Sequence, residues 1–238
     1  MTDGRTRSVT GVLPIVERAR LGLAELADPV VAPQMQRYMK SEMPFRGVPK
    51  PARIQLVRTL VAECPLPDAA ALRTAAEELW TGARFREERY LALALVDHSR
   101  YRRWSDPSWV PLLQGWIVTG AWWDFTDDIA SRRIGPLLRA HPEQLTPVLR
   151  AWATDEDRWL RRTAVISQLG SGAATDLGLL RYAVEANIAD PDFFLRKGIG
   201  WALRQHARVD PVWVRGFVAD HPGLSPLSRR EALKHLGE

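Results

Sequence analysis

The sequence is short of the features that mark a secreted, membrane or metal-binding protein. Cys64 is the only cysteine among 238 residues, which excludes an internal disulfide framework and argues against a zinc site of the usual spacing. No apolar run approaches the length of a membrane span, and no signal-peptide core follows the first residues. We therefore expect a cytoplasmic protein that has no contact with a membrane.

Familiar catalytic and cofactor motifs are also absent. The histidines are scattered without a His-Glu-x-x-His pattern, and the chain contains neither a Walker phosphate loop nor a nucleophile elbow. Gly198-Ile-Gly200 is too short for a dinucleotide fingerprint and lies in a helical pattern, where it favours close helix packing or close approach of a ligand. We therefore predict that the protein uses no metal and no cofactor.

Positive charge is in modest excess. The net charge is +5, the isoelectric point is about 9.8, and arginine dominates among the cations. Arginine-rich surfaces attract polyanions, and the planar guanidinium suits phosphate oxygens. This charge balance is compatible with a nucleic-acid partner and, equally, with simple solubility.

The hydrophobic pattern predicts an all-α chain. Strict alternation of apolar and polar residues, the mark of a half-buried strand, is absent. Prolines preceded by a side-chain oxygen acceptor predict helix starts, and glycines between periodic runs predict helix ends, with helices of roughly 10–17 residues. The starts are Asp28-Pro29, Asp106-Pro107, Asp190-Pro191, Asp210-Pro211 and Ser225-Pro226, and the ends are Gly82, Gly120, Gly170 and Gly223.

Basic pairs recur along the second half of the chain. Arg161-Arg162, Arg196-Lys197 and Arg229-Arg230 follow one another at about 35 residues, each near a helix start, with Arg86 to Arg89 a weaker copy. This period is typical of an α-solenoid, in which corresponding positions line one face. The pairs are either solvated surface or, together with helix N-terminal N–H groups, anion-binding sites.

From this repeat we predict one domain over residues 1–238. It would be a right-handed solenoid of about six helix pairs with a concave basic face, monomeric, and preceded by a flexible tail at residues 1–8.

One stretch mixes residues that rarely belong together. Residues 119–128 place Trp122 and Trp123 directly before Asp124, Asp127 and Asp128. Tryptophan is costly to expose and carboxylate is costly to bury, so the stretch is either a core tryptophan pair beside a wet face or a functional site. On a helix, the side chains of Trp123 and Asp127 share one face. Trp159 with Arg162, and Trp201 with Arg204, repeat this proximity at a spacing of three residues.

At these residues the chain resembles the AlkD family of alkylpurine DNA glycosylases, which is built from HEAT-like helical repeats. The resemblance covers most of the chain and rests on the order and spacing of several pieces. These are residues 37–40 (Arg-Tyr-Met-Lys), 78–80, 116–124, 141–142, 159–162, 200–204 and 229–235.

The resemblance implies an active cleft formed by Trp123, Asp127, Arg162 and Trp201. Asp127, Trp123 and Trp201 would be catalytic, Arg162 would grip a phosphate beside the lesion, and Tyr38 would line the cleft. We predict further DNA contacts from Arg161, Lys197, Arg204 and Lys40. Thr126 departs from the family pattern, which has an apolar residue there, and Asp128 adds a neighbouring carboxylate that could alter helix packing.

The implied activity is hydrolysis of the N-glycosidic bond of N3- or N7-alkylated purines in double-stranded DNA. The resemblance also implies that the damaged nucleotide is captured through its backbone, without a tight base-reading pocket. Two other functions stay open at this point. The chain could bind distorted or branched DNA without catalysis, or it could be a HEAT-type scaffold that binds proteins along its concave face.

Overall fold

A computed structural model describes residues 13–236, and the tail predicted at residues 1–8 lies outside them. Residues 13–236 form helices joined by turns and contain no strand, which confirms the all-α prediction. None of these helices has the length and apolarity needed to cross a membrane. The helices group into two compact units, Met1–Ser105 and Asp106–Glu238, so a single continuous array and its handedness stay predictions.

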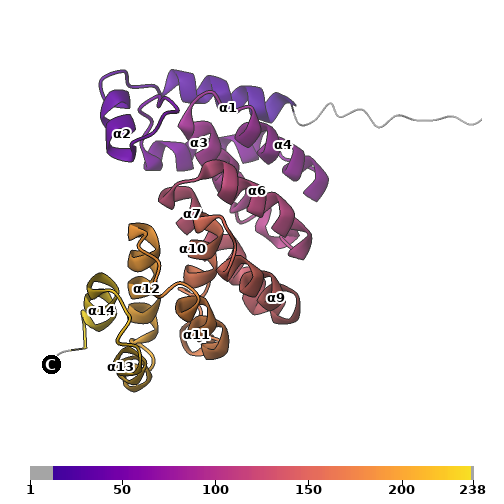
Figure 1. The fold of residues 1–238 in the computed structure, drawn as a ribbon. Coiled ribbons are helices and arrows are strands. Elements are labelled where there is room, and N and C mark those ends of the chain that lie inside the picture. The colour runs from indigo at the N-terminus through magenta and orange to yellow at the C-terminus, as the bar shows by residue number, and fades with distance from the viewer. Residues whose placement is uncertain (1–12, 237–238) are drawn as a thin grey trace, which may run out of the picture. The chain divides into compact units, whose positions relative to one another are not determined.

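The first unit is a small helical bundle. Its helices are α1 (Leu13–Glu25), α2 (Ala32–Met39), α3 (Lys50–Glu63), α4 (Ala69–Thr81) and α5 (Arg86–Val96), followed by the short 3₁₀ turn η1 (Arg102–Trp104) (Figure 1). The α5 helix packs against α1, α3 and α4. Its fully buried Glu87 carboxylate accepts hydrogen bonds from the backbone N–H groups of Arg46, Gly47 and Val48, which fixes the loop between α2 and α3.

The second unit carries the tryptophan–aspartate stretch. Its elements are η2 (Pro107–Trp109), α6 (Val110–Gly120), α7 (Trp123–Ile129), η3 (Ala130–Ile134), α8 (Gly135–Ala140), α9 (Pro142–Ala153), α10 (Arg158–Ile166), η4 (Gly172–Ala174), α11 (Leu177–Glu185), α12 (Phe193–His206), α13 (Pro211–Asp220) and α14 (Pro226–Leu233). The α7, α10, α12 and α14 helices are successive neighbours, each packed on the next (Figure 1).

Most of the predicted helix starts are confirmed. Asp106, Asp210 and Ser225 each accept a hydrogen bond from a backbone N–H in the first turn that follows. For Asp190-Pro191 the prediction is two residues early, because Asp192 is the residue that caps α12. Asp28 caps a turn ahead of α2 rather than the helix itself. Several helices have the predicted length, such as α3 and α12 with 14 residues each, whereas others are shorter, down to 6 residues in α8.

The N-termini of α10 and α12 are capped by aspartate side chains. The Asp157 carboxylate accepts from the N–H groups of Trp159 and Leu160, and the Asp192 carboxylate does the same at the start of α12. These N–H groups are therefore not available to a bound anion. Of the two alternatives left open for the basic pairs, the caps on α10 and α12 argue against anion binding shared with these N–H groups.

The α7 helix continues without a break through a π turn, η3, into α8. The turn lies just before Pro136, which has no N–H to donate to the carbonyl four residues earlier. Trp123 and Asp127 both lie before the π turn, so the helical spacing that places them on one face is preserved.

Candidate active site

Asp127 and Arg162 form a two-pronged ion pair between α7 and α10. The Arg162 Nε donates to Asp127 Oδ1 at 2.7 Å, and Nη2 donates to Oδ2 at 2.8 Å. The Arg162 side chain is only 4% exposed, whereas that of Asp127 is 17% exposed. The parallel geometry is the strongest that a guanidinium and a carboxylate adopt, and it fixes the carboxylate plane.

Burial has the largest effect on the pKa of the Asp127 carboxyl. Loss of solvent raises the pKa of Asp127 above its ordinary value, and the hydrogen bonds and charge of Arg162 offset that rise only in part. The negative charges of Asp124 and Asp128 raise the pKa further. A partly enclosed carboxylate with a shifted pKa and one fixed cationic partner is characteristic of functional sites, although structural ion pairs share the signature.

Arg162 also ties the pair to the next helix. Its Nη1 donates a short hydrogen bond to the backbone oxygen of Phe194 in α12. Gly198, one turn along α12, permits this contact, since a Cβ atom there would lie 3.0 Å from Nη1. The sequence predicted Arg162 as a phosphate contact, but the structure buries it as the anchor of Asp127, and a direct phosphate contact stays a prediction.

Two predicted catalytic tryptophans lie on the helices that flank this pair. Trp123 is half-buried on α7, one turn before Asp127, and Trp201 is half-buried on α12, three residues after Gly198. Neither belongs to the fully buried set that includes Trp80, Trp109 and Trp116. The half-buried state leaves part of each indole accessible to a ligand.

The first tryptophan of the pair, Trp122, belongs to an aromatic cluster. Its ring packs against Trp159 and Phe194, with centroids 6.1 and 5.5 Å away, and these two rings are 5.1 Å apart. The three rings join the first residues of α10 and α12 to the residue that caps α7. This cluster packs together the N-terminal ends of the three helices that carry the predicted catalytic residues and Arg162.

The two departures from the family pattern leave the pair intact. Thr126 is fully buried, and its hydroxyl donates to the Trp122 carbonyl oxygen at 3.0 Å, so no polar group is left unsatisfied. Asp128 instead faces Arg132 and Arg133, with nearest atoms 3.4 and 3.2 Å apart. Asp127 and Asp128 therefore have different partners, and Asp127 is the one paired with Arg162.

The other predicted DNA contacts in this unit are held by acidic partners. Arg161 Nη2 lies 3.0 Å from Asp190, and its Nη1 donates to two backbone oxygens of the turn before α10. Lys197 and Arg204 both bind Glu231 of α14. Tyr38 and Lys40 belong to the first unit, where Tyr38 is 78% exposed and Lys40 ends α2 with a φ of 49°.

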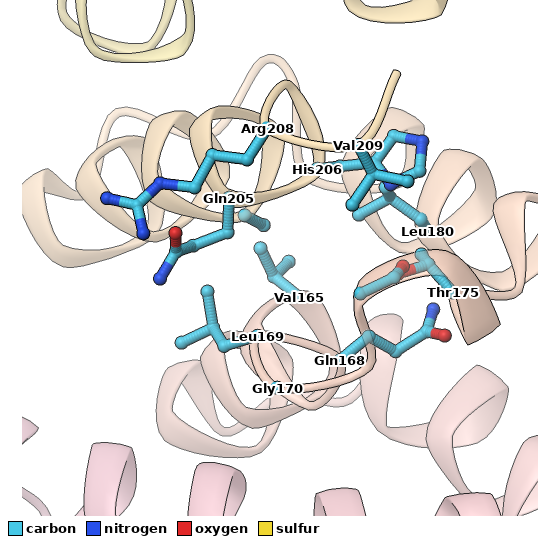
Figure 2. Close-up of a pocket in the computed structure, with 12 residues that line it drawn as sticks. Val165, Gln168, Leu169, Gly170, Thr175, Leu180, Gln205, His206, Arg208 and Val209 are labelled. Carbon is cyan, nitrogen blue, oxygen red and sulfur yellow. The ribbon is translucent and has the colours of Figure 1, made fainter. Parts of the chain in front are cut away.

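A cavity of about 280 Å³ lies at the other end of α10 and α12 and contains none of the predicted site residues. Figure 2 shows its apolar walls, which include Val165, Leu169 and Leu180, and its polar rim of Gln205 and Arg208. His206 is buried there without a hydrogen-bond partner for either ring nitrogen, and burial lowers the pKa of its imidazole. No group of three or more metal-ligating side chains occurs among residues 13–236.

Comparison with known proteins shows which family and which solved structure the chain resembles. The family model described as "DNA alkylation repair enzyme" matches residues 19–236. A solved structure described as a predicted DNA alkylation repair enzyme from Enterococcus faecalis is 30% identical, with a TM-score of 0.80. The match covers 89% of this chain and 97% of that chain. The sequence matches none of the curated proteins.

Proposed function

Because the chain belongs to the family of DNA alkylation repair enzymes, we propose that it is a monofunctional DNA glycosylase. It would release N3- and N7-alkylated purines, such as 3-methyladenine and 7-methylguanine, from double-stranded DNA. The observation that carries the proposal is the Asp127 carboxylate, fixed by Arg162 and still 17% exposed on a helix face shared with Trp123.

The chemistry requires little from the protein beyond one well-placed anion. Alkylation at N3 or N7 puts a positive charge on the purine, so the base leaves with the bonding electron pair and needs no strong general acid. The sugar becomes oxocarbenium-like at C1′, as in glycoside hydrolysis. Water then adds to C1′, and its proton passes to Asp127 or to solvent. Asp127 stabilises the sugar cation and positions the water.

Arg162 makes this role possible by holding the carboxylate rather than by touching the reacting atoms. A fixed anion needs no reorganisation when the sugar cation forms, and that is the source of electrostatic catalysis. Two unit charges 4 Å apart interact by about 4 kcal/mol at an effective dielectric near 20. If that interaction acts only in the transition state, it corresponds to roughly a thousandfold in rate.

The tryptophans complete the proposed site. The faces of Trp123 and Trp201 can pack on the deoxyribose and face the developing positive charge, to which an indole ring is attracted. Cations such as Lys197 and Arg204 would contact the phosphates on either side. Because sugar and phosphates are the groups recognised, the proposal does not require the base to be flipped into a pocket.

The direct test is release of free base. Purified protein is incubated with methylated duplex DNA, and the supernatant is analysed for 3-methyladenine and 7-methylguanine. The proposal predicts release of at least one base above the spontaneous rate. Release of neither base, by a protein that binds the same duplex, would favour the DNA-binding function without catalysis.

A further inference from the structure

Lys197, Trp201 and Arg204 lie on one face of α12. Their spacing of four and three residues brings them within about 60° of one another around the helix axis. A cation thus lies one turn before the half-buried Trp201 and another lies one turn after it. If Trp201 packs on the deoxyribose, as the proposed function requires, this is where the neighbouring phosphates would bind.

One carboxylate holds both of these cations. The Nζ of Lys197 donates to Oε1 of Glu231 at 2.6 Å, and Arg204 Nη1 donates a short bond to the other oxygen, Oε2. The hydrogen bond from Lys197 is the largest of the effects that lower the pKa of the Glu231 carboxyl. Glu231 therefore remains ionised and cancels one of the two positive charges beside Trp201.

The backbone is adapted to this contact. Gly200 lies against α14, where an added Cβ atom would be 2.5 Å from Glu231 Cβ and 3.0 Å from the backbone oxygen of Ser228. Ser228 also donates from its hydroxyl to the Arg196 carbonyl oxygen at 2.9 Å. The glycine and this hydrogen bond hold α14 so close to α12 that Glu231 reaches both cations at once.

The two cations are nevertheless accessible to a competing anion, although Glu231 itself is buried. The Lys197 side chain is 42% exposed and that of Arg204 is 20% exposed. A phosphate offers the same acceptor geometry as a carboxylate, so it can replace Glu231 on these cations. Cations that were themselves fully buried would not permit that exchange.

We propose that Glu231 competes with DNA by occupying, on Lys197 and Arg204, the positions a DNA phosphate would take. Phosphate binds beside Trp201 only by displacing it, so ordinary duplex is bound weakly there. The proposal rests on the proposed function for the orientation of DNA, but it concerns binding to undamaged duplex. It can therefore fail while base release is observed, and it can hold while base release is not.

The test compares the affinity of wild type and Glu231→Gln for an unmodified duplex over a range of salt concentrations. The variant should bind about tenfold more tightly at low salt, the effect of one charge-assisted hydrogen bond. Its plot of log affinity against log salt should be steeper by about 0.9, the slope of one more phosphate contact. A variant that was merely destabilised would bind more weakly, which is the opposite direction.

Glu185→Gln is the matched control, because Glu185 is an ion-paired carboxylate on α11 that contacts Arg181 and His221. The control variant should leave the affinity for duplex and the salt slope unchanged. The double variant Glu231→Gln, Lys197→Gln should lose the added slope. If Glu231→Gln does not fold, Glu231→Asp serves instead, because the shorter side chain cannot span both cations, and it should bind more tightly than wild type. Unchanged or weaker binding by a folded Glu231 variant, or tightening as large in Glu185→Gln, would overturn the proposal.

Discussion

At the scale of single residues, Asp127 and Arg162 determine what the site can do. The helix positions of Trp123 and Asp127 could be predicted because the spacing within one helix follows from the sequence. The partner of Asp127 could not, because the residues are 35 positions apart and their contact depends on how α7 packs on α10. For the same reason, no local pattern indicated that Arg162 is buried, or that Glu231 holds two predicted DNA contacts.

The pH dependence of base release should reveal Asp127. Because burial raises the pKa of this carboxyl, activity should fall as the pH drops through a value above the ordinary aspartate range. A group whose pKa is raised by folding favours the folded state most at low pH, and this contribution is lost as the pH rises through the raised pKa. Protonation of Asp127 should therefore inactivate the protein without unfolding it.

The measurement is the rate of 7-methylguanine release at a series of pH values, corrected for spontaneous loss, with circular dichroism recorded on the same samples. Asp127→Asn should retain only a low rate that does not change over this range. Loss of activity that coincides with loss of helical signal would instead indicate acid unfolding.

At the scale of helices, local signals predicted more than long-range ones. The capping roles of Asp106, Asp210 and Ser225 follow from residues within one turn, so the sequence was sufficient. The π turn between α7 and α8 was not foreseen, because Pro136 marks a disruption without specifying how the backbone accommodates it. Gly198-Ile-Gly200 was interpreted as favouring close helix packing or ligand approach, and the structure shows close packing at both glycines.

A pair of glycine substitutions tests that packing. Gly200→Ala should lower the free energy of unfolding by about 1–3 kcal/mol, because the new methyl group would overlap Glu231 and the Ser228 backbone. Gly216→Ala, in the middle of α13, meets no atom within 4 Å and should raise it by about 0.4–1 kcal/mol. Urea unfolding followed by circular dichroism measures the free energy of unfolding of both variants. Equal changes at the two positions would show that helix propensity alone, and not packing against α14, determines the effect.

At the scale of the whole chain, the sequence pattern predicted the all-α fold class but left open how the helices are arranged. Absent strand patterns and frequent capping signals were enough for an all-α assignment. The division into units at Ser105 and Asp106 has no local signal of its own, because it reflects where contacts between helices are sparse. Net charge likewise overstates the cations available to DNA, since Arg161, Lys197 and Arg204 each bind an acidic residue.

Binding to undamaged duplex should therefore depend on salt less steeply than the sequence suggests. The five predicted cationic contacts would give a slope of about −4.5 if all were free, at about −0.9 for each phosphate neutralised. We expect a shallower slope from a salt titration of wild-type binding. A slope of about −4.5 or steeper would show that the acidic residues release these cations when DNA binds. Absence of binding at low salt would instead favour the function of a protein-binding scaffold.

Base release should depend on Asp127, and a comparison of three aspartate variants tests this dependence. Release of 7-methylguanine from methylated duplex is measured for wild type, Asp127→Asn, Asp124→Asn and Asp128→Asn, with duplex affinity determined in parallel. We expect release by wild type, a loss of about a hundredfold to a thousandfold in Asp127→Asn with affinity retained, and smaller losses in the other two. Wild-type activity that survives Asp127→Asn, or depends instead on Asp124, would contradict it.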